Sequence, residues 1–222
     1  MAYSLTSARP HQTTDNSMQL IQRVQRAIGK RWYTLLPTAK LIAMISDRSG
    51  ARNADILIVV LKERLAHQDG SLDHLDWSSA ALKGALLSSC RMKQAKFSSA
   101  QLRGAYFGYS DLSAADLSLA DLRETHFREA ILINARFDRA NLRDANFARA
   151  VLVGSSFVAA DLTNANFWRA DLRGANLTDA LMKGCSIANI IVDETTTLPN
   201  GESCTDKVCW DRFTLGREFS RD

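Results

Sequence analysis

Histidines, cysteines and carboxylates are the side chains of this sequence that could carry catalysis or bind a metal. The four histidines are scattered along the chain, at His11, His67, His74 and His126. No nucleophile elbow, phosphate-binding glycine loop or histidine-rich metal spacing occurs. We therefore predict no catalytic residue, no metal and no cofactor, and we expect no small-molecule substrate.

The four cysteines do not form a metal motif or a disulfide framework. Cys204 and Cys209 are separated by four residues and lack the second pair of ligands that a structural zinc site needs. We predict two thiols in a reducing cytosol, with a disulfide between them as the alternative.

Several aspartates recur at multiples of five residues, at Asp111, Asp116, Asp121, Asp161 and Asp171. A fixed spacing of this kind indicates one structural position used many times. No catalytic carboxylate pair is predicted from them.

This spacing belongs to a five-residue repeat that runs from Leu75 to Glu194 and organises the chain. The stretch of 120 residues holds 24 units, and the large residue at the centre of every unit is apolar. The centres are Trp77, Leu82, Leu87, Met92, Phe97, Leu102, Phe107, Leu112, Leu117, Leu122, Phe127, Leu132, Phe137, Leu142, Phe147, Leu152, Phe157, Leu162, Phe167, Leu172, Leu177, Met182, Ile187 and Val192. A small residue lies two positions before nearly every centre. Cys90 and Cys185 occupy that small position, so we expect buried, inert thiols there.

A period of five fits neither a straight helix nor a flat strand. On an α-helix, successive centres would step by roughly 140° around the axis and scatter. On a strand, an odd period sends successive centres to opposite faces. The chain must therefore bend once per unit so that every centre points to a common axis, and stacked coils of such a chain form a solenoid.

Units such as Ala120-Asp121-Leu122-Arg123-Glu124 and Ala140-Asn141-Leu142-Arg143-Asp144 resemble the pentapeptide repeat family, whose unit is Ala-Asp/Asn-Leu-x-x. The resemblance implies a mainly β fold, a right-handed quadrilateral β-helix with one unit per side and about six coils. It also implies that the centres and small residues fill the interior while the last two positions of each unit face water. Departures from the family's Asp or Asn occur at Leu86, Tyr106, Ile131, Val151 and Ile191.

The sequence divides into four segments: a lead at 1–14, a helical N-terminal cap at 15–74, the repeats at 75–194 and a capping tail at 195–222. Apolar residues at helical spacing predict a helix from Asp15, a short helix at 38–46 and a third at about 53–67. The β-branched run at 54–61 leaves a strand as the alternative for part of the third helix. These helices would cover the first coil, whose open edge would otherwise pair with other chains. The tail resembles a frequent ending of bacterial family members, with a turn at Leu198-Pro199-Asn200-Gly201 followed by Arg212-Phe213-Thr214. It would lay Trp210 and Phe213 over the last coil.

If one coil has twenty residues, one side of the solenoid carries a column of cations. This basic ladder consists of Lys83, Arg103, Arg123, Arg143 and Lys183, with Thr163 completing the column. Like charges stacked at strand spacing repel one another. Either nearby acids neutralise the ladder, which makes it structural, or an anionic partner does.

A second side carries four apolar residues at positions that are usually polar or exposed. Ile131 and Ile133 in one coil stack against Val151 and Val153 in the next, and we call these four residues the apolar square. A cluster of this kind suggests a contact surface. The alternative is that the tail or a terminal helix covers it.

The leading functional prediction is a non-catalytic scaffold or adaptor that binds an unidentified protein or a second copy of itself. One alternative is DNA mimicry, as in family members that protect DNA gyrase from quinolones, but this needs an acidic surface and the chain has a net charge of +4. Another is binding of an anionic membrane surface or nucleic acid through the basic ladder and the basic N-terminal helix. No signal peptide or twenty-residue apolar run occurs in the sequence, so we expect a cytoplasmic protein.

Overall fold

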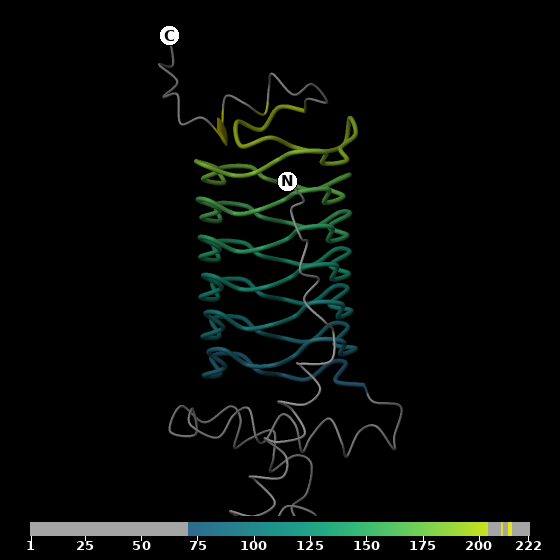
Figure 1. The fold of residues 1–222 in the computed structure, drawn as a ribbon, viewed down its shortest axis with the longest axis vertical. Helices are drawn as coiled ribbons and strands as arrows, with labels where there is room; N and C mark the ends of the chain where they lie inside the picture. The colour runs from purple at the N-terminus through teal and green to yellow at the C-terminus, as the bar shows by residue number, and fades with distance from the viewer. Residues whose placement is uncertain (1–70, 204–209, 211–212, 215–222) are drawn as a thin grey trace, which may run out of the picture.

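The computed structural model describes residues 71–203, 210 and 213–214, and it shows them as a tall stack of similar coils (Figure 1). Adjacent coils meet through isolated parallel bridges that pair residues twenty positions apart, from Ser71 with Arg91 to Asp171 with Ile191. Four units therefore make one coil, and the chain forms a repeat β-solenoid. The predicted N-terminal helices, Cys204 and Cys209 lie outside the described residues.

Backbone hydrogen bonds between coils use three of the five N–H groups in most units. In the unit centred on Phe147, the N–H groups of Asn146, Phe147 and Arg149 donate to carbonyls of neighbouring coils at 2.9, 2.8 and 2.8 Å. A fourth N–H, that of Ala150, closes a turn on the carbonyl of Phe147 at 2.9 Å. Only the N–H of Ala148, directly after the centre, is left without a backbone acceptor in this unit.

Each turn requires a left-handed backbone at the second residue after the centre. Every such residue from His74 to Asn189 has a positive φ, and most of them are not glycine. Leu119, for example, has a φ of 61°, a conformation that costs an L-residue roughly 1–2 kcal/mol. The interior packing and the ladder bonds must offset this strain in every unit.

Where an Asp or Asn lies before the centre, as in ten of the 24 units, its side-chain oxygen can accept the one N–H that the backbone does not use. The side-chain oxygen of Asn146 accepts the N–H of Ala148 at 3.0 Å, and Asn176 accepts that of Thr178 at 3.0 Å. The same bond, at 2.9–3.1 Å, is made by Asp76, Asp111, Asp116, Asp161 and Asn166. Such Asx turns give the recurring aspartates a structural role.

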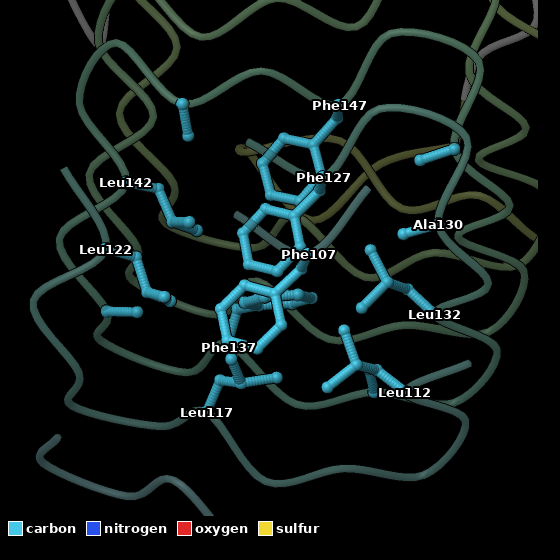
Figure 2. Close-up of a cluster of buried hydrophobic side chains, with 14 of the residues drawn as sticks. Phe107, Leu112, Leu117, Leu122, Phe127, Ala130, Leu132, Phe137, Leu142 and Phe147 are labelled. Carbon is cyan, nitrogen blue, oxygen red and sulfur yellow. The ribbon is translucent and has the colours of Figure 1, made fainter. Parts of the chain in front are cut away.

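Apolar centres fill the interior of the solenoid in straight columns. All the predicted centres from Trp77 to Met182 are at most 2% exposed, while Ile187 and Val192 are partly buried. In one column, the ring of Phe147 stacks on Phe127 at 4.9 Å (Figure 2). On its other face it stacks on Phe167 at 5.1 Å. Phe137 and Phe157 from the adjacent side meet the same ring edge-on at 5.7 and 5.8 Å.

The ladder extends beyond both predicted ends of the repeat. At the start, Ser71 already bridges Arg91 and Leu72 is 1% exposed, so the solenoid begins before Leu75. At the end, one inserted residue changes the spacing, and Asn176 bridges Thr197 twenty-one positions away. Leu198 is then 2% exposed and serves as another centre beyond Glu194.

A short reversal follows this last centre. Gly201, with a φ of 84°, donates its N–H to the carbonyl of Leu198 at 2.9 Å, and Thr197 forms an antiparallel bridge with Ser203. Trp210 is 1% exposed within the core, and Phe213 packs against that core. The carbonyl of Thr214 accepts the N–H of Gly184 at 2.8 Å, which ties this part of the tail to the solenoid.

The Phe147→Ala substitution should lower the free energy of unfolding by about 3–5 kcal/mol, because it opens a cavity in the stacked aromatic column. Ala145→Leu should also destabilise, by about 1–3 kcal/mol, since the small position has no room for a longer side chain. Chemical denaturation of each variant measures the change. The control is Arg149→Ala, which removes an exposed side chain two residues after the centre; a loss as large as that of Phe147→Ala would contradict this packing.

Candidate functional site

The described residues contain no recognisable catalytic or metal centre. Within them, no three His, Cys, Asp or Glu side chains lie close enough together to hold a metal ion. His126 stacks against the ring of Tyr106 at 4.6 Å, and His74 is exposed. No helix among these residues is long and apolar enough to cross a bilayer. The candidate sites are therefore surfaces.

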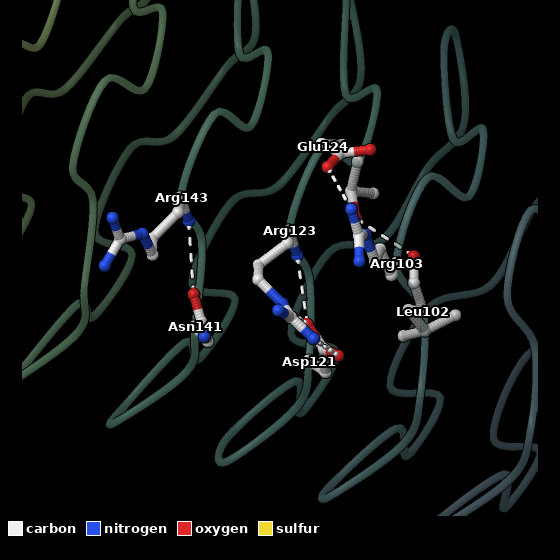
Figure 3. Close-up of polar contacts among 8 residues, drawn as sticks. Leu102, Arg103, Asp121, Arg123, Glu124, Asn141 and Arg143 are labelled. Atoms are coloured by element: carbon white, nitrogen blue, oxygen red, sulfur yellow. Dashed lines mark hydrogen bonds and ion pairs between the residues drawn. The ribbon is translucent and has the colours of Figure 1, made fainter.

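The three arginines of the basic ladder pair with acids of the same solenoid, and Figure 3 shows the pairs of Arg103 with Glu124 and of Arg123 with Asp121. Arg103 pairs with Glu124 at 2.6 Å, and Arg143 lies 3.6 Å from Asp161. Arg123 forms a two-pronged pair with Asp121, at 2.8 Å from Nε and 2.7 Å from Nη2. Lys83 and Lys183, at the two ends of the column, make no ion pair with any described residue. The structural interpretation of the ladder thus applies to its three arginines.

Hydrogen bonds from the Arg123 guanidinium hold the pKa of Asp121 below its ordinary value, and the same contact raises the pKa of Arg123. Both side chains are about a third exposed or more, at 31% and 40%. Pairs in such contact with water contribute little to stability. Their main effect is to cancel the positive charge of the column, which leaves less positive charge to attract an anionic partner.

The apolar square consists of two exposed and two half-buried side chains on adjacent coils. Ile131 bridges Val151, and the N–H of Asn134 donates to the carbonyl of Val153 at 2.9 Å, so the two coils stack in register. Ile131 is 40% exposed and Ile133 is 37% exposed, while both valines are half-buried. The structure thus brings all four predicted residues together.

Charged pairs border the square on both sides along the solenoid axis. On the preceding coil, Asp111 bridges Ile131 and pairs with Lys93 at 3.2 Å. On the following coil, Asp171 bridges Val151 and pairs with Arg173 at 2.7 Å. Hydrogen bonds from Arg173 lower the pKa of Asp171. The arrangement is an apolar centre inside a polar rim.

The sequence model of the family described as pentapeptide repeats matches this chain in eight copies, over residues 78–108, 107–144 and 140–179. The repeats belong to the pentapeptide repeat family. The departures from its pattern at Ile131 and Val151 are therefore departures within a genuine repeat.

Solved structures similar to this chain are also pentapeptide repeat proteins. Rfr23 from the cyanobacterium Cyanothece 51142 is 21% identical, with a TM-score of 0.42 over 60% of this chain and 95% of its own. A protein of the Arabidopsis thaliana thylakoid lumen is 34% identical, with a TM-score of 0.35 over 44% of this chain and 64% of its own. HetL from Nostoc sp. strain PCC 7120, involved in heterocyst differentiation regulation, is 27% identical, with a TM-score of 0.29 over 60% and 68%. None of the curated proteins compared with the chain matches it.

Two further surface features of these pentapeptide repeats were not predicted from the sequence. The first is a column of exposed residues at Leu86 and Tyr106, continued by His126. The second is a shallow hollow at one corner, lined by Arg149, Arg169, Asn189 and Ile191. A search for residues twenty positions apart would have identified the Leu86 column and the column of Arg149, Arg169 and Asn189. The hollow also depends on where the long arginine side chains point, which such a search does not give.

The cysteines at the small positions are buried, as predicted, at 7% exposure for Cys90 and 8% for Cys185. The thiol of Cys185 donates to the carbonyl of Leu162 at 3.0 Å. Ser110 makes the matching bond to Leu87 at 2.7 Å, so a hydroxyl fits this position equally well. Burial raises the pKa of Cys185 to about 12 from its ordinary value of 9.0.

Raising the pH above about 9 should therefore destabilise the protein through Cys185. Between pH 9 and pH 12 the unfolded chain loses the thiol proton while the folded chain keeps it, so stability is complete below pH 9 and falls as the pH rises. The slope from one thiol is at most about 1.4 kcal/mol per pH unit. Urea denaturation of the parent and of Cys185→Ser at pH 7.5 to 10.5 measures this; identical slopes for both proteins would exclude the effect.

Proposed function

We propose that this protein is a non-catalytic interaction scaffold of the pentapeptide repeat family, and that the apolar square is its contact surface. The observation that carries the proposal is the exposure of Ile131 and Ile133, at 40% and 37%, directly against Val151 and Val153 on the next coil. An apolar centre within a polar rim is the usual anatomy of a protein–protein interface. The partner is another protein or a second copy of this chain.

The square replaces residues that would otherwise satisfy the backbone. In neighbouring units of the same side, Asp111 accepts the N–H of Ser113 at 3.1 Å and Asp171 accepts that of Arg173 at 3.3 Å. Ile131 and Val151 cannot do this, and no described residue accepts the N–H of Ile133 or Val153. Interior packing does not require an aliphatic residue in place of Asp or Asn at these two positions, because the side chains of Ile131 and Val151 point outward. A role in binding accounts for it.

The size of the square sets a condition on the partner. A stable interface buries about 800 Å² on each side, which is more than four aliphatic side chains supply. The partner must therefore also contact the rim, where Lys93 with Asp111 and Arg173 with Asp171 present both signs of charge. A two-fold dimer through this side would place the same surface on both subunits, which is the self-complementary arrangement that closed dimers use.

The finer features of the fold belong to the same proposal. They are a right-handed, four-sided path of about six coils, a helical cap formed by 15–74 and a closing tail at 195–222. The twenty-residue spacing of the bridges and the burial of Trp210 support the four-sided path and the closing tail. Covered ends would leave the sides of the solenoid as its free surfaces, which suits a scaffold.

Changing Ile133 and Val153 to Asp should abolish binding through the square while leaving the fold nearly intact. Both residues face outward, so the free energy of unfolding should change little, whereas two unpaired charges would enter the contact. Light scattering measures the mass of the parent and the variant, and capture from the native cell extract measures heterologous binding.

The matched control is Thr163→Asp with Ala188→Asp, which adds the same two charges directly after the centre on two other sides. It should behave like the parent in both assays. The proposal is wrong if Ile133→Asp/Val153→Asp retains the parent's mass and its captured proteins.

A further inference from the structure

A positively charged hollow lies at one corner of the solenoid, on a different part of the surface from the basic ladder. Arg149, Arg169 and Asn189 occupy the same left-handed turn position on three successive coils, with φ values of 62°, 56° and 58°. Backbone bonds keep the first two coils in register here, since Arg149 donates to the carbonyl of Trp168 at 2.8 Å. With Ile191 these three residues line a shallow volume of about 610 Å³.

The described acids around the hollow neutralise its arginines only in part. Glu129 is shared by Arg128 at 3.4 Å and by Arg149 at 3.6 Å. Arg169 forms no ion pair with any described carboxylate, and Asp171, two residues away, is held by both nitrogens of Arg173 at 2.9 and 2.7 Å. The corner therefore keeps an excess of positive charge.

Two guanidinium groups on adjacent coils stand on backbones about 4.7–4.9 Å apart, a spacing at which like charges repel. The Arg169 guanidinium lies over the Trp168 ring, with Cζ at 4.7 Å from the centroid, which restricts where it can turn. A bound anion relieves the repulsion and accepts several N–H bonds at once. A guanidinium group commonly binds phosphate through two parallel N–H···O hydrogen bonds.

We propose that this corner hollow binds a phosphate monoester. The Arg149 and Arg169 guanidinium groups and the Asn189 side-chain amide donate to the phosphate oxygens, and the organic part of the ligand lies on Ile191, which is 50% exposed. The inference does not depend on the proposed function, because an anion can bind here whether or not the apolar square binds a protein. The phosphate can come from a small molecule or from a phosphorylated side chain of a protein.

The test is isothermal titration of the full chain, at low salt and millimolar ligand, with inorganic phosphate, phenyl phosphate and a short phosphotyrosine peptide. Phenyl phosphate should bind more tightly than inorganic phosphate because its ring contacts Ile191, and Ile191→Ala should remove that difference. The Arg149→Gln/Arg169→Gln variant should weaken binding of every probe by about tenfold or more, the loss expected when charged hydrogen bonds to phosphate are removed. Tighter binding of the peptide than of phenyl phosphate would identify a protein-borne phosphate, and equal binding a small molecule.

The matched control is Arg139→Gln. Arg139 holds the same left-handed turn position, with a φ of 57°, on another edge of the solenoid and is also exposed. It should leave the affinity for all three probes unchanged. The proposal is overturned if no probe binds, if Arg139→Gln weakens binding as much as the double substitution does, or if the double substitution has no effect on a folded protein.

Discussion

The ladder of backbone hydrogen bonds between coils is the constraint on which the rest of this structure depends. It joins residues twenty positions apart and uses three N–H groups of most five-residue units, while the turn uses a fourth. One N–H remains, and a buried or half-buried donor without a partner costs about 1–3 kcal/mol. The side chain before the centre is the nearest group that can accept it, which gives a physical reason for Asp or Asn at that position.

The same constraint turns the surface into columns that can be assigned from the sequence. A residue lies directly against the residues twenty positions before and after it, so charge and hydrophobicity accumulate along one side or cancel there. Arg103, Arg123 and Arg143 form one such column and are balanced by acids from their own unit or from the adjacent coil. Ile131 and Val151 form another, where two successive coils have an aliphatic residue in place of the Asp or Asn, exposed at Ile131 and half-buried at Val151. On this side of the solenoid the family pattern is broken, and the exposed surface is apolar.

The interior was predictable from the sequence because every centre is equivalent. Phe147 and Leu142 are buried for the same reason, and a period of five residues is enough to identify both. The ends were harder to place. Ser71 and Leu72 already belong to the ladder although the residues before them break the pattern, and at the other end the inserted residue hides Leu198 from a strict period. Asp193 stabilises that insertion by accepting the N–H groups of Thr195 at 3.0 Å and Gly174 at 3.2 Å, a contact that no periodicity predicts.

Of the candidate sites, the apolar square followed from register alone, because its residues are short and their direction is fixed by the backbone. The corner hollow did not follow from register. Its shape depends on how the Arg149 and Arg169 side chains extend, and its charge depends on which arginines already pair with Glu129 and Asp171. Long side chains choose their partners among several acids within reach, and the sequence does not specify that choice.

Amide hydrogen exchange, measured residue by residue by NMR, tests the role of the Asp or Asn side chain most directly. Thr178 and Val158 follow the centres of adjacent coils on one side and are equally half-buried, but only Thr178 has a side-chain acceptor, on Asn176. Trp168 and Arg128 form a second matched pair, both exposed, with Asn166 accepting only the N–H of Trp168. We expect several-fold slower exchange at Thr178 and Trp168 than at Val158 and Arg128, because each of the first two N–H groups makes a hydrogen bond of about 1 kcal/mol. Equal exchange rates within both pairs would contradict this expectation.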